Sequence, residues 1–269
     1  MNQKDFGETW RNPDSDYFIR FMDRVNALDF FKNYKRHCIE RMQLRPGQHV
    51  LDVGCGTGED AQAIAQGVAP SGRIVGLDIS ETMIGEARQR AEGKGLPVEY
   101  CVGDAHHLDF NDSTFDIACT FSAFEILADP RQALKEMIRT VKPGGFVIVP
   151  GPDPASLAIN GSDHALNRRI VDHFADKAVN GWLGRNLRGL FVELGMKETH
   201  VVPLTMVLTD LVTARDLWLQ SIADNARDAG VVSAAEAASW LADLEQSARA
   251  DRFFWGSTTY IVSGRKKNA

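Results

Sequence analysis

The chain has 269 residues, of which 44% are hydrophobic, and a formal net charge of −6 at pH 7. This length is sufficient for one large α/β unit with a substantial core and an appended cap. The acidic balance argues against a nucleic-acid enzyme, which needs a basic face for phosphates, because the one basic cluster is residues 265–267. We therefore expect a small-molecule or peptide substrate and no nucleic-acid partner.

The cysteines and the N-terminal residues indicate a compartment. Cys38, Cys55, Cys101 and Cys119 lack the spacing of metal ligands, and two of them lie in apolar runs. We interpret them as reduced thiols and expect no metal site. The N-terminus has no signal-peptide segment, and no apolar run approaches the length of a membrane span. These features predict a cytoplasmic protein without a membrane partner.

The first predicted elements are helical. Residues 15–42 have a helical pattern with a break near Leu28 and Asp29, and Phe31, Tyr34 and Cys38 share one face of the second half. We assign residues 1–44 to an N-terminal helical cap and residues 45–269 to the main domain, which together form one compact unit.

Residues 49–58 predict a buried strand that ends in a glycine loop and is followed by a helix. The apolar run 49–53 precedes Gly54, Gly56 and Gly58, and residues 59–68 carry alanine, isoleucine and valine at helical spacing. Three alternate glycines leave no Cβ between the backbone and a ligand, and the helix that follows offers free N–H groups. A sharp turn alone is the plainer interpretation, but two further features favour a nucleotide-like ligand.

These features follow the next two predicted strands. Residues 73–78 form a second strand that ends at Asp78, the position at which doubly wound folds bind ribose hydroxyls. Residues 98–102 form a third strand that ends at Gly103-Asp104-Ala105. Three successive strands thus end in glycine or aspartate at the edge where parallel sheets bind ligands.

The second half of the chain predicts four more strands. Residues 115–120 and 146–149 are the fourth and fifth, and between them Asp129 caps a helix that begins at Pro130. Helices are predicted at 163–179 and 182–194. Residues 201–208 and 253–262 form the last two strands, separated by an insertion of about 210–252 with two helices, the second opened by a Ser233 and Glu236 capping box.

Four motifs carry a family resemblance. Asp52-Val-Gly-Cys-Gly-Thr-Gly58, Gly76-Leu-Asp78, Gly103-Asp104-Ala105 and Lys142-Pro-Gly-Gly145 arrive in order over residues 46–150 and resemble class I S-adenosylmethionine-dependent methyltransferases. The similarity is greatest to the small-molecule enzymes of the ubiquinone/menaquinone-methyltransferase-like group. It implies a Rossmann-like, doubly wound, seven-stranded and mostly parallel sheet that ends in an antiparallel edge hairpin. It also implies S-adenosyl-L-methionine as cofactor and a small-molecule acceptor.

The resemblance assigns roles to residues. It implies that Asp78 binds the ribose and that Asp104 accepts from the adenine amino group, with the Ala105 N–H nearby. The complete expected cofactor set is Asp52, Gly54, Cys55, Gly56, Gly58, Asp78, Ile79, Met83, Gly103, Asp104, Ala105 and Phe121. The expected acceptor contacts are Tyr17, Phe18, Phe124, Asp153 and Trp218. The N-terminal helices are expected either to cover the pocket or simply to pack on the sheet, and the insertion to form a lid, a dimer contact or plain packing.

The reaction limits what the sequence must show. Methyl transfer from a sulfonium releases a neutral group, so a base is needed only for an acceptor that is protonated. Many relatives have a histidine where this chain has Ile126, so Glu125, flanked by apolar residues, is our candidate base ahead of His106, His107, Asp153, His164 and His173.

Three classes of function remain open. We predict methyl transfer to an apolar or aromatic metabolite at O, N or C, by a monomer or a homodimer. A protein of this fold that uses the cofactor in a non-methylating cyclisation or rearrangement is the alternative. A nicotinamide-dependent dehydrogenase ranks last, because the glycine pattern is Gly-x-Gly-x-Gly.

Overall fold

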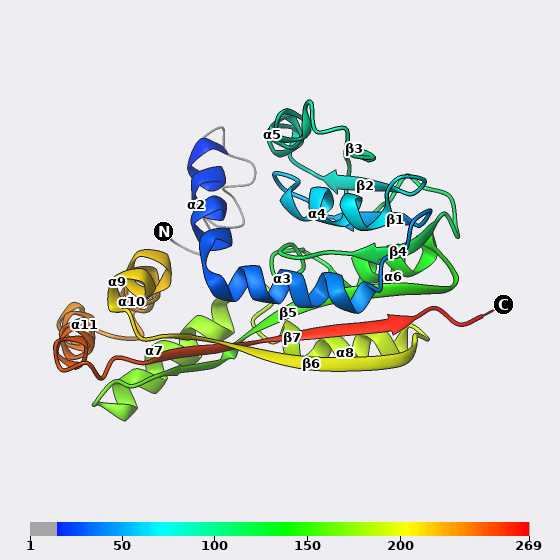
Figure 1. Ribbon diagram of the computed structural model, residues 1–269. Coiled ribbons are helices and arrows are strands. Elements are labelled where there is room, and N and C mark those ends of the chain that lie inside the picture. The colour runs from blue at the N-terminus through cyan, green and yellow to red at the C-terminus, as the bar shows by residue number, and fades with distance from the viewer. Residues whose placement is uncertain (1–14, 269) are drawn as a thin grey trace.

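A seven-stranded sheet organises the molecule in the computed structural model, which describes residues 15–268, with side chains from residue 19 onward. The strand order is β3-β2-β1-β4-β5-β7-β6 (Figure 1). All pairings from β3 to β5 are parallel, and β7 pairs antiparallel with both β5 and β6. The predicted doubly wound sheet with an antiparallel edge pair is therefore confirmed. Its strands are β1 (His49–Val53), β2 (Arg73–Asp78), β3 (Val98–Val102), β4 (Phe115–Cys119), β5 (Val141–Ile159), β6 (Lys197–Leu208) and β7 (Trp255–Arg265).

Helices cover both faces of this sheet, which explains why its central strands are apolar at successive positions. Leu51 and Val53 of β1 belong to a buried cluster with α6 (Pro130–Thr140) and α8 (Leu183–Glu193). Val50 belongs to a second cluster on the opposite face, with α3 (Asp29–Met42), α4 (Glu59–Val68) and α5 (Glu81–Ala91). Because the strand side chains alternate between the two clusters, the sheet is fixed in register from both sides.

Strand β5 is much longer than the predicted 146–149, and the prediction of its end was wrong. It begins at Val141, directly after α6, and continues through Pro150 and Pro152 to Ile159. Its pairing with β4 ends at Cys119 opposite Ile148, so the prolines lie where β5 has a partner on one side only. Proline is tolerated at such an edge because no ladder hydrogen bond is lost there. Strands β5, β6 and β7 consequently extend beyond the parallel part of the sheet (Figure 1).

The two N-terminal helices meet at the predicted break. Helix α2 (Ser15–Ala27) ends, Leu28 has an extended conformation with ψ 137°, and α3 begins at Asp29. Helix α3 packs on the sheet through buried Tyr34, Cys38 and Met42. The bend at Leu28 directs α2 away from the face of the sheet that α3 covers (Figure 1).

The insertion between β6 and β7 lies at the far end of the long strands (Figure 1). Its first helix is continuous but contains a π-helical turn: α9 (Leu211–Ala214), η1 (Arg215–Leu219) and α10 (Gln220–Asp228) follow one another. The second, α11 (Ala234–Arg249), begins with the predicted Ser233 and Glu236 capping box. Together with α7 (His164–Lys177) these helices enclose a third buried cluster, which includes Trp240 and Leu244. Within residues 15–268, no helix combines the length and the apolar character that a membrane span requires.

Candidate functional site

The glycine loop between β1 and α4 is shaped by close contacts. Gly54, Gly56 and Gly58 all have positive φ, at 74°, 51° and 80°. A Cβ on Gly54 would lie 2.4 Å from the Cβ of Ala123, and one on Gly58 would lie 2.4 Å from the Tyr100 hydroxyl. Gly56 differs, since a Cβ there would meet nothing within 4 Å. Two of the glycines thus allow neighbouring chain to approach, and the middle one faces open space.

Asp78 joins the glycine loop to the end of β2. Its Oδ2 accepts from the Gly56 N–H at 2.9 Å and its Oδ1 accepts from the Ser80 N–H at 3.0 Å. The residue is 4% exposed. Burial raises the pKa of Asp78, while the hydrogen bonds from Ser80 and Gly56 oppose that increase. These two N–H donors fix the carboxylate and leave each oxygen capacity for a further donor.

The loop after β3 is held by a local network around His106. Its backbone N–H and its Nδ1 both contact Asp104 Oδ1, at 2.9 and 2.7 Å. The Asp129 N–H donates to His106 Nε2 at 3.2 Å, so both ring nitrogens of His106 are engaged. The N–H donation from His106 lowers the pKa of Asp104. His106 therefore shapes the loop and has no free nitrogen for a general base.

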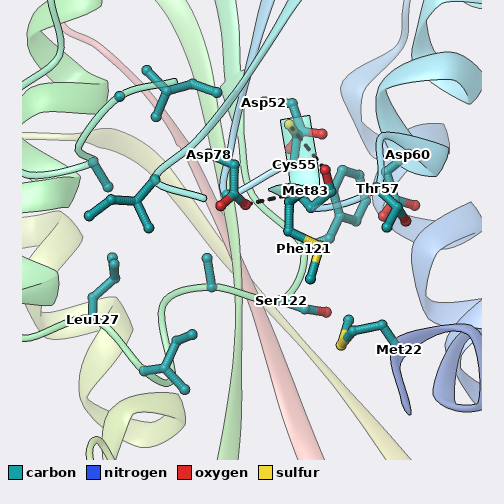
Figure 2. Close-up of a pocket in the computed structure, with 18 of the residues that line it drawn as sticks. Met22, Asp52, Cys55, Thr57, Asp60, Asp78, Met83, Phe121, Ser122 and Leu127 are labelled. Atoms are coloured by element: carbon teal, nitrogen blue, oxygen red, sulfur yellow. Dashed lines mark hydrogen bonds between the residues drawn. The ribbon is translucent and has the colours of Figure 1, made fainter. Parts of the chain in front are cut away.

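These loops border a pocket of about 490 Å³ at the carboxyl edge of the sheet, within the usual range for small-molecule sites. Asp78 lies near its centre, with Asp60 and Thr57 to one side and Leu127 to the other (Figure 2). The pocket brings together eleven of the twelve expected cofactor residues: Asp52, Gly54, Cys55, Gly56, Asp78, Ile79, Met83, Gly103, Asp104, Ala105 and Phe121. The twelfth, Gly58, packs against Tyr100 behind the loop.

Several lining residues have no counterpart in the sequence prediction. Met22 and Asn26 of α2 and Lys35 of α3 reach the pocket from the N-terminal helices. Lys35 Nζ lies 2.7 Å from Asp60 Oδ2, and both side chains are largely buried. No short motif marks these residues, because their position depends on how α2 and α3 pack against the rest of the chain. Asp60 and Glu59 had a signal, as acidic residues in the first turn of the helix after the glycine loop.

Two buried acceptors at this end of the pocket have no donor within the described part of the chain. Asp52 Oδ2 is one, and Asn26 Oδ1 is the other. Asp52 is 1% exposed, and burial raises its pKa, as does the charge of Asp60, whereas Lys35 lowers it. Leaving a buried acceptor without a donor is costly, so these atoms fit a ligand that carries donors.

Glu125 is positioned beside the pocket and not on its lining. Its neighbours Ala123 and Ile126 line the pocket, and its Oε2 is buried without a hydrogen-bond partner among the described residues. Burial raises the pKa of Glu125 to about 7. A carboxyl group in this state can accept a proton near neutral pH.

The expected acceptor contacts lie elsewhere. Phe124 is fully buried, Asp153 is 1% exposed and pairs with Arg185 at 2.7 Å, and Trp218 stacks on Trp255 with ring centroids 5.2 Å apart. None of these three lines the pocket. Tyr17 and Phe18 belong to α2, but their side chains lie outside the described residues. The assignment of all five to the acceptor stays a prediction.

The pocket fits a nucleoside that carries an amino-acid chain. Carboxylates at the ends of β2 and β3 suit ribose and adenine donors, and open space lies over Gly56. Near Asp52, two buried acceptors have no donor in the part of the chain that the structure describes. Fold and site thus define a doubly wound protein with a nucleoside-type cofactor pocket. The family described as a methyltransferase domain matches residues 50–145. The chain belongs to the class I S-adenosylmethionine-dependent methyltransferases, and its cofactor is S-adenosylmethionine.

Relatives extend this match beyond the cofactor motifs. The chain is 37% identical over 247 residues to an uncharacterized 37.1 kDa protein in transposon TN4556 of Streptomyces fradiae, which covers 91% of this chain and 70% of that protein. It is 37% identical over 140 residues to demethylmenaquinone methyltransferase of Bacillus cereus, which covers 49% of this chain and 59% of that enzyme. The chain thus matches little more than half the length of this second relative.

Solved structures share the fold at low identity. The YcgJ protein of Bacillus subtilis superposes with a TM-score of 0.61 at 18% identity, covering 88% of this chain and all of that one. The [4+2]-cyclase SpnF superposes with a TM-score of 0.55 at 21% identity, covering 88% of this chain and 82% of that one. Such similarity supports the Rossmann-like methyltransferase fold and does not identify an acceptor.

Proposed function

We propose that this methyltransferase acts on a small apolar or aromatic metabolite and transfers the methyl group to O, N or C. The observation that carries the proposal is the composition of the pocket beyond Asp78, where Met22, Ile126, Leu127 and Val179 form an apolar border. This border suits an acceptor without charge. The name of the Bacillus cereus relative, demethylmenaquinone methyltransferase, is consistent with such an acceptor.

Electrostatics support the same choice. Five carboxylates line the pocket, and the chain has a formal net charge of −6. A polyanionic acceptor would be repelled by this surface, whereas the sulfonium cofactor is attracted. The proposal accordingly includes neither nucleic acid nor a membrane as partner, and it describes a cytoplasmic enzyme that acts as a monomer or a homodimer.

The cofactor supplies an activated methyl group with a neutral leaving group, so the protein's work is to position the acceptor and exclude water. We assign this role to the N-terminal cap of residues 1–44, because Met22 and Asn26 already border the pocket. Tyr17 and Phe18 precede them on α2 and stay our predicted acceptor contacts, with Phe124, Asp153 and Trp218.

Glu125 is the proposed base for an acceptor that carries a proton. Its Oε2 is buried without a hydrogen-bond partner among residues 15–268, and its pKa of about 7 allows it to take up a proton at neutral pH. His106 does not perform this role in the proposal, because both of its ring nitrogens are engaged.

A non-methylating cyclisation or rearrangement is the alternative. Its support is the shared fold of the [4+2]-cyclase SpnF, together with Ile126 at the position where many methyltransferases have a histidine. The two functions differ in whether the cofactor is consumed.

Mass spectrometry distinguishes them. The purified protein is incubated with S-adenosylmethionine and a panel of phenols, quinols and amines, and S-adenosylhomocysteine is quantified with any product heavier by one methylene. The proposal predicts both species in equal amounts and, at a cofactor concentration near the wild-type Kd, less of both with Asp78→Ala. A new product of unchanged mass, with the cofactor intact, would contradict methyl transfer and support the alternative.

A further inference from the structure

Lys35 holds an unusual position for a lysine. It lies on α3 between the buried residues Tyr34 and Cys38, and its side chain is only 12% exposed. Its Nζ is 2.7 Å from Asp60 Oδ2 in the first turn of α4, where the side chain of Asp60 is 16% exposed. Desolvating such a pair costs free energy that the attraction between its members only partly offsets. A role in ligand binding explains why this charge is placed inside the pocket.

Lys35 is also the one lysine or arginine among the described residues that line the pocket. The other charged lining groups are carboxylates: Asp52, Glu59, Asp60, Asp78 and Asp104. A negatively charged ligand group would be repelled by most of this surface. The side chain of Lys35 therefore defines the point at which the pocket accepts an anion.

The neighbouring acceptors require a cation or another donor. Asp52 Oδ2 and Asn26 Oδ1 are buried at the same end of the pocket, and each lacks a donor within the described residues. Asn26 Nδ2 is already engaged, since it donates to Glu59 at 3.1 Å. A lysine ammonium beside two unpartnered oxygens matches a zwitterion that has a carboxylate and an ammonium group on one carbon.

The position of Asp78 indicates which part of the cofactor lies near Lys35. Asp104 and Asp78 are at the ends of β3 and β2, whereas Asp52 and Lys35 lie at β1 and α3 on the other side (Figure 2 shows Asp52, Asp60 and Asp78). With the nucleoside at the β2 and β3 ends, the amino-acid chain extends toward Lys35. We propose that Lys35 binds the α-carboxylate of the cofactor, an inference that rests on the assignment of this pocket to S-adenosylmethionine.

Asp60 then acts as a positioning residue. Its carboxylate holds the Lys35 ammonium over the pocket before the ligand binds, because both groups are already paired at 2.7 Å. Lys35 belongs to α3 and Asn26 to α2, so the amino-acid end of the cofactor contacts the N-terminal helices directly. The cofactor site thus extends beyond the segment that carries the four motifs.

A pair of ligands isolates the carboxylate contact. Calorimetry measures the affinity of wild type and Lys35→Met for S-adenosylmethionine and for decarboxylated S-adenosylmethionine, which lacks the carboxylate alone. We expect Lys35→Met to lower the affinity for S-adenosylmethionine roughly 10- to 100-fold, which is the effect of losing a charge-assisted hydrogen bond. Affinity for the decarboxylated ligand stays within about threefold, because that ligand offers Lys35 nothing to bind.

Two further variants separate binding from structure. Lys35→Met/Asp60→Asn removes both charges of the ion pair, so neither member is left without its partner, and it is expected to show the same ligand discrimination. Lys32→Met, on the exposed side of the same helix, where Lys32 lies 3.8 Å from Asp29, is the matched control and should bind both ligands like wild type.

Equal losses for both ligands in Lys35→Met and in the double variant would show that Lys35 only supports the fold, and would overturn the proposal. Unchanged affinity for S-adenosylmethionine would overturn it as well. If the wild type bound neither ligand, the cofactor assignment itself would fail, and this result is distinct from failure of the Lys35 contact.

Discussion

The two ends of the molecule are built by different means. At the carboxyl edge of β1, β2 and β3, the site consists of short loops whose backbone is fixed by hydrogen bonds between neighbours, such as the Gly56 N–H to Asp78. At the other end, the insertion and α7 enclose Trp240 and Leu244 through contacts between helices that are distant in sequence. The first region is determined locally, whereas the second depends on packing.

This difference explains the role of the insertion. Fully buried Leu219 and Leu244 share a cluster with Ile170 of α7, so we expect the insertion to complete a core and not to act as a detachable lid. We expect deletion of residues 211–250 to yield no soluble protein, because Ile170 and its neighbours would be exposed. Soluble protein that still binds the cofactor would show that the core does not need the insertion.

Among single substitutions, the largest effect on stability is expected for Trp240→Ala. Trp240 is 2% exposed and its Nε1 donates to Asn167 Oδ1 at 2.9 Å, so the substitution should cost about 3–5 kcal/mol of unfolding free energy. Denaturant titration measures the loss. Cofactor affinity of the folded fraction should not change, because Trp240 does not line the pocket. The control is Trp182→Ala, at a half-exposed site, with a cost of less than about 1 kcal/mol.

Glu125→Gln tests whether the buried carboxyl group beside the pocket is the general base. With an acceptor that carries a proton, the wild-type rate should increase as the pH rises through about 7, because the base is the ionised form of a carboxyl whose pKa burial raises. Glu125→Gln should lower the rate at pH 8 roughly 100-fold and remove this increase. The control is Glu193→Gln at an exposed ion pair with Arg131. A wild-type pH profile retained by Glu125→Gln would eliminate Glu125 as the base.

Asp78→Ala examines the cofactor edge itself. We expect cofactor affinity to fall roughly 10- to 100-fold, because the variant lacks the buried carboxylate that we propose accepts hydrogen bonds from the ribose hydroxyls. Calorimetry gives the affinity, and circular dichroism verifies the fold. Asp78→Asn keeps one acceptor oxygen, so its cofactor affinity should fall less than that of Asp78→Ala. Undiminished affinity in the alanine variant would remove Asp78 from the site.

The smallest effect is expected from paired glycine variants. Gly56→Ala adds a methyl group in open space on the pocket and should weaken cofactor binding about tenfold, at a strain of only about 1 kcal/mol. Gly58→Ala places a methyl group against Tyr100 outside the lining, so it should lower the melting temperature more. The reverse ranking would show that the two glycines have been assigned the wrong roles.

Sequence reasoning succeeded where structure is local. The break at Leu28 and the Ser233 capping box follow from local sequence patterns. The mostly parallel sheet with its antiparallel edge pair, and the expected cofactor residues of which eleven line the pocket, came with the family resemblance. The predicted length of β5 was wrong. Pro150 and Pro152 normally indicate the end of a strand, and the sequence does not show that β4 stops opposite Ile148, beyond which proline is tolerated.

The remaining site residues could not be predicted for the same physical reason. Lys35 and Asn26 are helical residues with no motif, and they reach the pocket only because Tyr34 and Cys38 bury α3 on the sheet. The half of the site that contacts the cap is therefore a product of tertiary packing.

The most direct test of this account is a crystal structure with S-adenosylhomocysteine. The account predicts the adenine beside Asp104 and Ala105, the ribose hydroxyls on Asp78, and the carboxylate within hydrogen-bond distance of Lys35. A ligand bound outside this pocket, or with its ribose away from Asp78, would contradict the proposed site.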